Sequence, residues 1–145
     1  MVAAMSTTPT LETLLASSGL ADKARQVDNN LVRLQWGSAF VLVGVSGTAI
    51  VAIAPLFREV PHGKELAFYK KLLEHNAYMG GMASFAIQHD GWVILHAGRA
   101  LRGIDTQEFA TLVSGVGRFA DQFDDTLIAE FYASDKEATN QAPVD

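Results

Sequence analysis

The chain begins with a helical hydrophobic pattern that gives way to strand alternation. One apolar stripe at three- and four-residue spacing comes before Gly19, and its members are Leu11, Leu14 and Leu15. This predicts a short helix that is capped at Thr8, continues through Pro9 and ends at Gly19. Residues 20–30 are mostly polar and predict a connection. Residues 31–36 alternate between apolar and polar side chains, which predicts a strand.

The most hydrophobic stretch is Ala39 to Phe57, nineteen residues without a charge. A helix of that length could span a membrane. However, Val and Ile dominate the stretch, Ser46-Gly47-Thr48 divides it into two pieces of strand length, and Pro55 lies near its end. We therefore favour a β-hairpin, and a membrane-tethered domain is the less favoured alternative.

This hairpin has no polar face. If the two pieces pair across Ser46-Gly47, one face of the hairpin consists of Val41, Val43, Val45, Ile50 and Ala52. The opposite face consists of Phe40, Leu42, Val51 and Ile53. An antiparallel sheet usually presents one face to water, so these strands require cover on both faces. Helices of the same chain could supply both covers, or a second chain could supply one of them.

A second helix and a second hairpin follow. Residues 64–77 predict an amphipathic helix, whose apolar stripe is Leu66, Tyr69, Leu73 and Ala77. A three-residue turn with Gly91 in a left-handed conformation places Ala83, Phe85, Ile87, Val93, Leu95 and Ala97 on one apolar face. On the other face it places Trp92, Ile94 and His96. That face suits an interface, although scattered surface hydrophobic residues would fit equally well.

A long C-terminal helix completes the pattern. Asp105 and Glu108 form a predicted capping box, and apolar residues then recur at helical spacing to about Tyr132. Gly115 and Gly117 weaken a helix by about 1 kcal/mol each relative to alanine, which suggests that this helix approaches the sheet closely.

Composition sets the domain organisation. The chain has 145 residues, 49% of them hydrophobic, and no cysteine, which fits one domain with a core of its own. We expect a flexible N-terminus at residues 1–8, one domain at 9–133 and a disordered acidic tail at 134–145. The net charge is −5, and residues 121–145 carry seven acids and one lysine. Without a cluster of cations, a nucleic-acid or anionic-membrane surface is not expected.

The search for chemistry gives no catalytic, cofactor or metal site. The four histidines have no metal-ligand spacing, and the chain has no phosphate-binding glycine motif. Gly44-Val45-Ser46-Gly47 begins like a nucleophile elbow, but Thr48 stands where a glycine is required. We therefore expect neither an enzyme nor a cofactor.

One stretch resembles a known family. Leu72 to Asp105 is similar to the central block of the type III secretion chaperone-like superfamily, which also contains the YbjN-like regulators. The matching features are Leu72-Leu73 followed by Asn76, a glycine-bearing loop, a strand, the Asp90-Gly91 turn, a second strand and a long helix. The resemblance implies a single-domain α+β fold with the order α-β-β-β-α-β-β-α and an antiparallel sheet covered by helices.

The resemblance also implies a non-catalytic, cytoplasmic homodimer that holds an extended segment of a client protein. The implied client contacts are Leu11, Leu14, Leu15, Phe40, Leu42, Val51 and Ile53. The implied dimer contacts are Leu66, Tyr69, Leu73, Trp92 and Ile94. Each set could instead be ordinary core. The alternative within the same family is a YbjN-like regulator that binds a folded partner.

Overall fold

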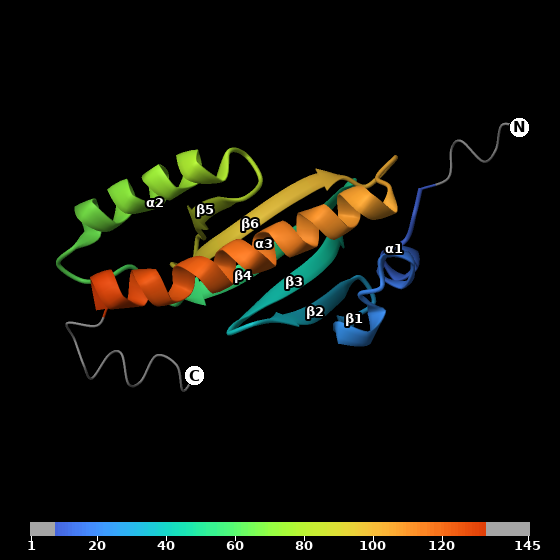
Figure 1. Ribbon diagram of the computed structural model, residues 1–145, viewed down its shortest axis with the longest axis horizontal. Coiled ribbons are helices and arrows are strands. Elements are labelled where there is room, and N and C mark those ends of the chain that lie inside the picture. The colour runs from blue at the N-terminus through green and yellow to red at the C-terminus, as the bar shows by residue number, and fades with distance from the viewer. Residues whose placement is uncertain (1–7, 133–145) are drawn as a thin grey trace, which may run out of the picture.

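The structure is a computed structural model that describes residues 8–132 (Figure 1). The helices are α1 (Leu11–Ser18), α2 (Glu65–Met79) and α3 (Thr106–Leu127), with short helical turns η2 (Ala21–Lys23) and η3 (Ile128–Tyr132). The strands are β1 (Ala24–Asp28), β2 (Leu31–Trp36), β3 (Ala39–Ser46), β4 (Ala49–Phe57), β5 (Ser84–Ile87) and β6 (Val93–Ala100). The flexible ends predicted at residues 1–8 and 134–145 lie outside the described residues, except for Thr8.

The strands form one antiparallel sheet in the order β1-β2-β3-β4-β6-β5. Strand β6 therefore lies between β4 and β5, and the two edges of the sheet are β1 and β5. The predicted α+β class and antiparallel sheet are confirmed, and the observed order of elements has one strand more than the predicted α-β-β-β-α-β-β-α. The uncharged stretch from Ala39 to Phe57 forms β3 and β4, as the hairpin interpretation predicts.

Strand β1 is the element that the sequence analysis missed. Residues 20–30 were predicted to be a connection, but Ala24–Asp28 pairs with β2. Four of its five side chains are exposed, so no hydrophobic alternation marks the strand. The turn that follows the strand does have a recognisable sequence: the backbone N–H of Asn30 donates to the Asp28 carboxylate at 3.0 Å, a contact typical of Asp in turns. The ladder with β2 then supplies the backbone hydrogen bonds that this polar segment needs.

The predicted faces of both hairpins are confirmed, although the two-residue turn of the first lies at Gly47-Thr48 rather than at Ser46-Gly47, because Ser46 pairs with Ala49. In the first hairpin Leu42 pairs with Ile53 and Val43 pairs with Ala52, which separates the two apolar faces as expected. In the second, Phe85 pairs with Leu95, and Gly91 has φ +97° in a three-residue turn. A slip of one residue would move every side chain to the opposite face, so the side-chain pattern was sufficient to predict which residues share a face.

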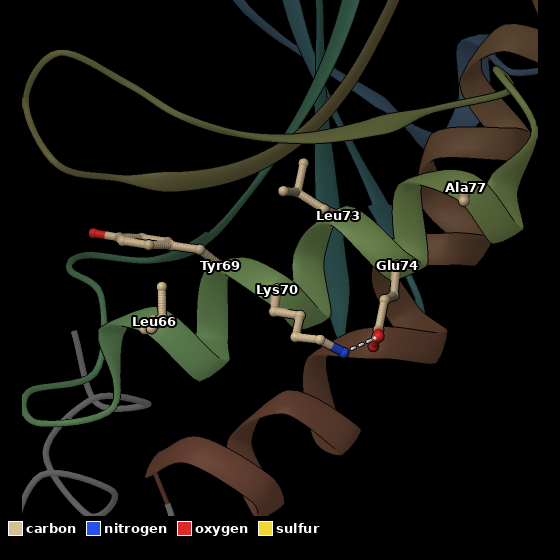
Figure 2. A pocket seen from close by; sticks show the side chains of 6 residues that line it. All are labelled: Leu66, Tyr69, Lys70, Leu73, Glu74 and Ala77. Carbon is tan, nitrogen blue, oxygen red and sulfur yellow. Dashed lines mark hydrogen bonds and ion pairs between the residues drawn. The ribbon is translucent and has the colours of Figure 1, made fainter.

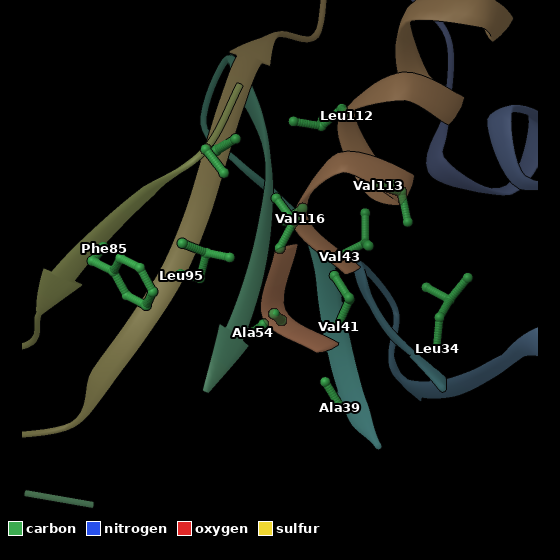
Figure 3. Close-up of a cluster of buried hydrophobic side chains, with 14 of the residues drawn as sticks. Leu34, Ala39, Val41, Val43, Ala54, Phe85, Leu95, Leu112, Val113 and Val116 are labelled. Carbon is green, nitrogen blue, oxygen red and sulfur yellow. The ribbon is translucent and has the colours of Figure 1, made fainter. Parts of the chain in front are cut away.

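The core lies between one face of the sheet and α3. Figure 3 shows Leu112, Val113 and Val116 of α3 directed at Val41, Val43, Ala54 and Leu95 of the sheet, and all of these side chains are buried. The close approach predicted for α3 is found at Gly117, where an added Cβ would lie 2.5 Å from the ring of Trp36. At Gly115 the nearest atom would be Cε of Met82 at 3.8 Å, an ordinary contact.

The helix ends partly follow the predicted caps. The N-cap of α1 is Thr10 rather than Thr8, and the Thr13 N–H donates to its hydroxyl at 3.1 Å. Gly19 ends α1 in a left-handed conformation, as predicted. At α3 the Glu108 N–H donates to Asp105 at 2.7 Å, while the Glu108 carboxylate lies 3.6 Å from Nε of Arg99.

Candidate functional site

All three α-helices lie on the same face of the sheet. Helix α3 packs on β2, β3, β4 and β6, α1 packs on α3, and α2 packs on edge strand β5 (Figure 1). Within residues 8–132 no helix packs on the opposite face, which we call the open face. Of the two covers that the sequence analysis considered, the described helices of this chain supply only one.

The open face is apolar in its centre. The alternating register of β3 and β4 brings Phe40, Leu42, Val51 and Ile53 together there, and all four are half-buried. This is the sheet part of the predicted client surface, and the structure assembles it as one patch. A sheet face of this composition, without a helix over it, is typical of a surface that another chain covers.

The other client candidates are in a different place. Leu11, Leu14 and Leu15 of α1 are buried in the core cluster, against α3. They therefore do not join the open face in this structure. For these three residues, the ordinary-core alternative describes where the side chains lie.

Helix α2 presents a second apolar surface. Its buried face consists of Phe68, Leu72 and Met79. The predicted stripe lies on an adjacent face, where Leu66, Tyr69 and Leu73 are 83%, 39% and 68% exposed. Figure 2 shows the Lys70–Glu74 ion pair beside this stripe, and both of its residues line the same pocket as Leu66, Tyr69 and Leu73.

Exposed hydrophobic side chains are concentrated at this edge of the molecule. Six large ones are exposed among the described residues: Val27, Leu66, Tyr69, Leu73, Tyr78 and Ile87. All but Val27 lie on α2 or on β5, the strand against which α2 packs. We call the stripe Leu66, Tyr69 and Leu73 the α2 surface. Of the remaining dimer candidates, Ile94 lies on the open face of β6 and is only 5% exposed, and Trp92 immediately precedes that strand.

Asn76 fixes α2 against the edge of the sheet. Its side-chain oxygen accepts the N–H of Phe85 at 2.7 Å, and its amide nitrogen lies 3.5 Å from the Phe85 carbonyl. Phe85 belongs to edge strand β5, whose outward backbone groups have no neighbouring strand. Asn76, the polar residue of the motif quoted above, therefore occupies the position of a missing strand and sets the place of α2.

His75 lies at the contact between α2 and α3. Its ring stacks on Phe123 with centroids 4.2 Å apart, and its Nε2 is buried without a hydrogen-bond partner among the described residues. Burial lowers the pKa of His75, and nearby Lys71 lowers it further. Glu130 and Glu74 act in the opposite direction. The result is a neutral aromatic side chain in an aromatic cluster.

A polar contact holds the far end of α3 to the β2–β3 turn. The Ser38 N–H and hydroxyl donate to Asp121 at 2.9 and 2.8 Å, and the hydroxyl also lies 2.8 Å from Asp124. These hydrogen bonds lower the pKa of Asp121, whereas burial raises the pKa of Asp124. The two carboxylates thus have different environments, but both serve to attach the turn to the helix.

Residues 8–132 contain neither a cluster of metal-ligating side chains nor a helix that could cross a membrane. In that range, no three potential metal-ligating side chains lie close enough together to hold an ion. None of the helices there is long and apolar enough to cross a membrane.

Comparison with solved structures places the fold. A chain of the heterodimeric ExoU–SpcU complex from the type III secretion system of Pseudomonas aeruginosa is 19% identical, with a TM-score of 0.61 over 80% of this chain and 96% of that chain. YbjN from E. coli is 15% identical, with a TM-score of 0.59 over 83% and 96%. The Yersinia pestis type III secretion chaperone SycH, in complex with a fragment of YscM2, is 14% identical, with a TM-score of 0.52 over 77% and 94%.

The fold is that of the secretion chaperones and YbjN. This confirms the resemblance drawn from Leu72 to Asp105. No protein-family profile matches the chain, and no curated protein sequence matches it. At these identities the likeness concerns the fold, so the function has to be argued from the surfaces described above.

Proposed function

We propose that this chain is a non-enzymatic, homodimeric protein-binding module that holds an extended segment of a client protein on its open face. The observation that carries the proposal is the apolar open face, which no described helix covers. Burial of apolar surface is favourable by about 25 cal/mol per Å², so an uncovered patch of this kind favours association. A cytoplasmic location, expected from the resemblance, is part of the proposal.

The contacts that we propose for the client are the four open-face residues Phe40, Leu42, Val51 and Ile53. They form a continuous patch over β3 and β4. Leu11, Leu14 and Leu15 would contribute only if α1 separated from α3, because all three are buried. The proposed client site is therefore on the sheet.

The similar structures support a protein partner. One is a heterodimeric complex, and another contains a secretion chaperone with a fragment of a second protein. The partners in these complexes are partners of those proteins and not of this chain. The complexes support the view that this fold can bind another polypeptide chain.

We assign self-association to the α2 surface. Leu66 and Leu73 are more than two-thirds exposed, and they lie one helical turn either side of Tyr69. Asn76 and the His75 stack hold α2 in place, so this surface is presented on a fixed helix. A two-fold pairing would place each stripe against its copy, since an isologous interface uses the same patch on both subunits.

The second candidate is a YbjN-like regulator that binds a folded partner. Its support is the similarity to YbjN, which extends over 83% of this chain. The two candidates differ in the state of the partner. An extended segment can lie along the strands of an open face, whereas a folded partner requires matching surfaces.

The state of the partner can be tested with one model protein in two forms. The full chain is titrated with a permanently unfolded, carboxymethylated protein and with the same protein in its folded form, by isothermal calorimetry. We expect binding to the unfolded form only. Binding to the folded form alone would favour the regulator-like alternative, and binding to neither would contradict both.

Variants locate the site. Leu42→Asp places a charge in the centre of the open face and should abolish binding to the unfolded protein. Val27→Asp is the control, because it places the same charge on a hydrophobic residue that is 53% exposed and lies on edge strand β1, outside the patch. Equal loss in both variants would show that the open face is not the site.

A further inference from the structure

The open face carries positive charge at its β1–β2 end. Arg25 of β1 and Arg33 of β2 are directly paired across the ladder, and both are exposed. Like charges that face each other across two strands are destabilising. Neither arginine makes an ion pair within residues 8–132, so no residue in that range offsets this repulsion through an ion pair.

Acidic residues are missing from the rest of this face. The open-face positions of β2 to β6, identified from their pairing, are apolar or uncharged apart from Arg33. The nearest acid along the ladder is Asp28, whose carboxylate accepts the Asn30 N–H in the turn. The open face is therefore cationic in a protein whose net charge is −5.

The cation is placed against the apolar patch. The Arg33 guanidinium lies 3.8 Å from the ring centroid of Phe40, a cation–π contact that holds it over the centre of the face. Two of the five N–H donors of a guanidinium can donate in parallel to the two oxygens of a carboxylate. A partner that covers Phe40 and Leu42 would thus meet two guanidinium groups, neither of which has an ion pair within residues 8–132, at the edge of the same patch.

We propose that the segment bound on the open face is acidic as well as apolar, with carboxylates that pair with Arg25 and Arg33 beside apolar side chains that cover Phe40 and Leu42. This inference rests on the proposed protein-binding function and specifies its partner. An anionic membrane would also supply negative charge. The observations favour a polypeptide, because the few arginines near this face border an apolar centre and two of them already lie on aromatic rings: Arg33 on Phe40 and Arg58, 5.9 Å from the ring centroid, on Trp92.

The test compares two synthetic peptides that differ only in charge. One is a fluorescein-labelled peptide of leucine and glutamate, and its twin has lysine in place of every glutamate. Both are titrated with the full chain in a fluorescence anisotropy experiment. We expect the acidic peptide to bind about tenfold tighter, equivalent to about 1.4 kcal/mol, as two partly exposed ion pairs would give.

Charge reversal provides the control. The double variant Arg25→Glu/Arg33→Glu should lose the preference for the acidic peptide and favour the basic one. The single variant Arg33→Gln removes one positive charge without adding a negative one, and it should lose part of the preference for the acidic peptide. Arg118→Glu, which reverses an exposed charge on α3 on the other side of the sheet, should leave both affinities unchanged.

The outcomes separate this inference from the function on which it rests. If both peptides bind equally and Leu42→Asp abolishes both, the open face binds protein but has no acidic preference, and the inference is wrong. If neither peptide binds and the unfolded model protein also fails to bind, the proposed function itself is wrong. Binding to phosphatidylglycerol vesicles, with no binding to either peptide, would overturn the inference in favour of a membrane.

Discussion

Two glycines in one helix should respond in opposite ways to the same substitution. Gly115 and Gly117 both lie in the middle of α3. A Cβ at position 115 would make an ordinary contact, 3.8 Å from Met82, whereas a Cβ at position 117 would lie 2.5 Å from two ring carbons of Trp36. We predict that Gly115→Ala stabilises the protein and that Gly117→Ala is the less stable of the two variants.

The magnitude follows from two contributions. Replacing glycine by alanine in a helix interior stabilises by about 1 kcal/mol, and this gain is common to both positions. Forcing an extra methyl into a packed contact costs about 1–3 kcal/mol, and only position 117 carries this cost. The difference between the two variants is therefore about 1–3 kcal/mol, and Gly117→Ala should lie at or below the stability of the original chain.

Urea unfolding of both variants at one fixed protein concentration measures this difference in the free energy of unfolding. The m-values of the two variants should be equal, which would show that only stability has changed. Removing the ring should remove the cost, so Gly117→Ala combined with Trp36→Leu should show a favourable coupling. Equal stabilisation by the two glycine substitutions would refute the close approach of α3 to Trp36.

Three other predictions concern contacts that hold the elements together. Asn76→Ala should lower the free energy of unfolding by about 1 kcal/mol and speed hydrogen exchange at the Phe85 amide, whereas Asn76→Asp keeps the acceptor and should leave that amide protected. Because the folded state lowers the pKa of His75, the free energy of unfolding should fall as the pH drops below about 6.5, and His75→Phe should flatten this dependence in a pH series of urea melts. If the free energy of unfolding of His75→Phe depended on pH as that of the original chain does, His75 would not be the source of the pH dependence. Ser38→Ala should raise the pKa of Asp121 in an NMR titration, because the hydroxyl donor is lost, and no change would contradict the contact.

The two hairpins show what the sequence was able to predict. Their faces followed from side-chain alternation alone, but the turn of the first hairpin lies one residue later than predicted, because alternation does not distinguish alignments that are two residues apart. Strand β1 lacked that signal because nearly all of its side chains are exposed. The turn residues Asp28 and Asn30 were the sequence signal that could have indicated this strand. Because β1 was not predicted, the pairing of Arg25 with Arg33 was not predicted either.

The buried face of helix α2 could not be predicted from the sequence. Its sequence carries two neighbouring apolar stripes, one with Phe68 and Leu72 and the other with Leu66 and Leu73. Periodicity identified the helix but could not decide which stripe is buried, because that depends on where edge strand β5 lies. The structure buries the first stripe and exposes the second. This is why the second stripe is available for a partner.

Sedimentation velocity of the full chain at micromolar concentration tests the central claim most directly, because that claim is that other chains cover its apolar surfaces. We expect a dimer with twice the 15.6 kDa mass of one chain. Leu66→Glu combined with Leu73→Glu should convert it to a folded monomer, and Val27→Glu, the matched exposed hydrophobic position outside α2, should leave the dimer intact. A stable monomer for the unmodified chain across the concentration range, or a dimer that survives both α2 substitutions, would contradict the account.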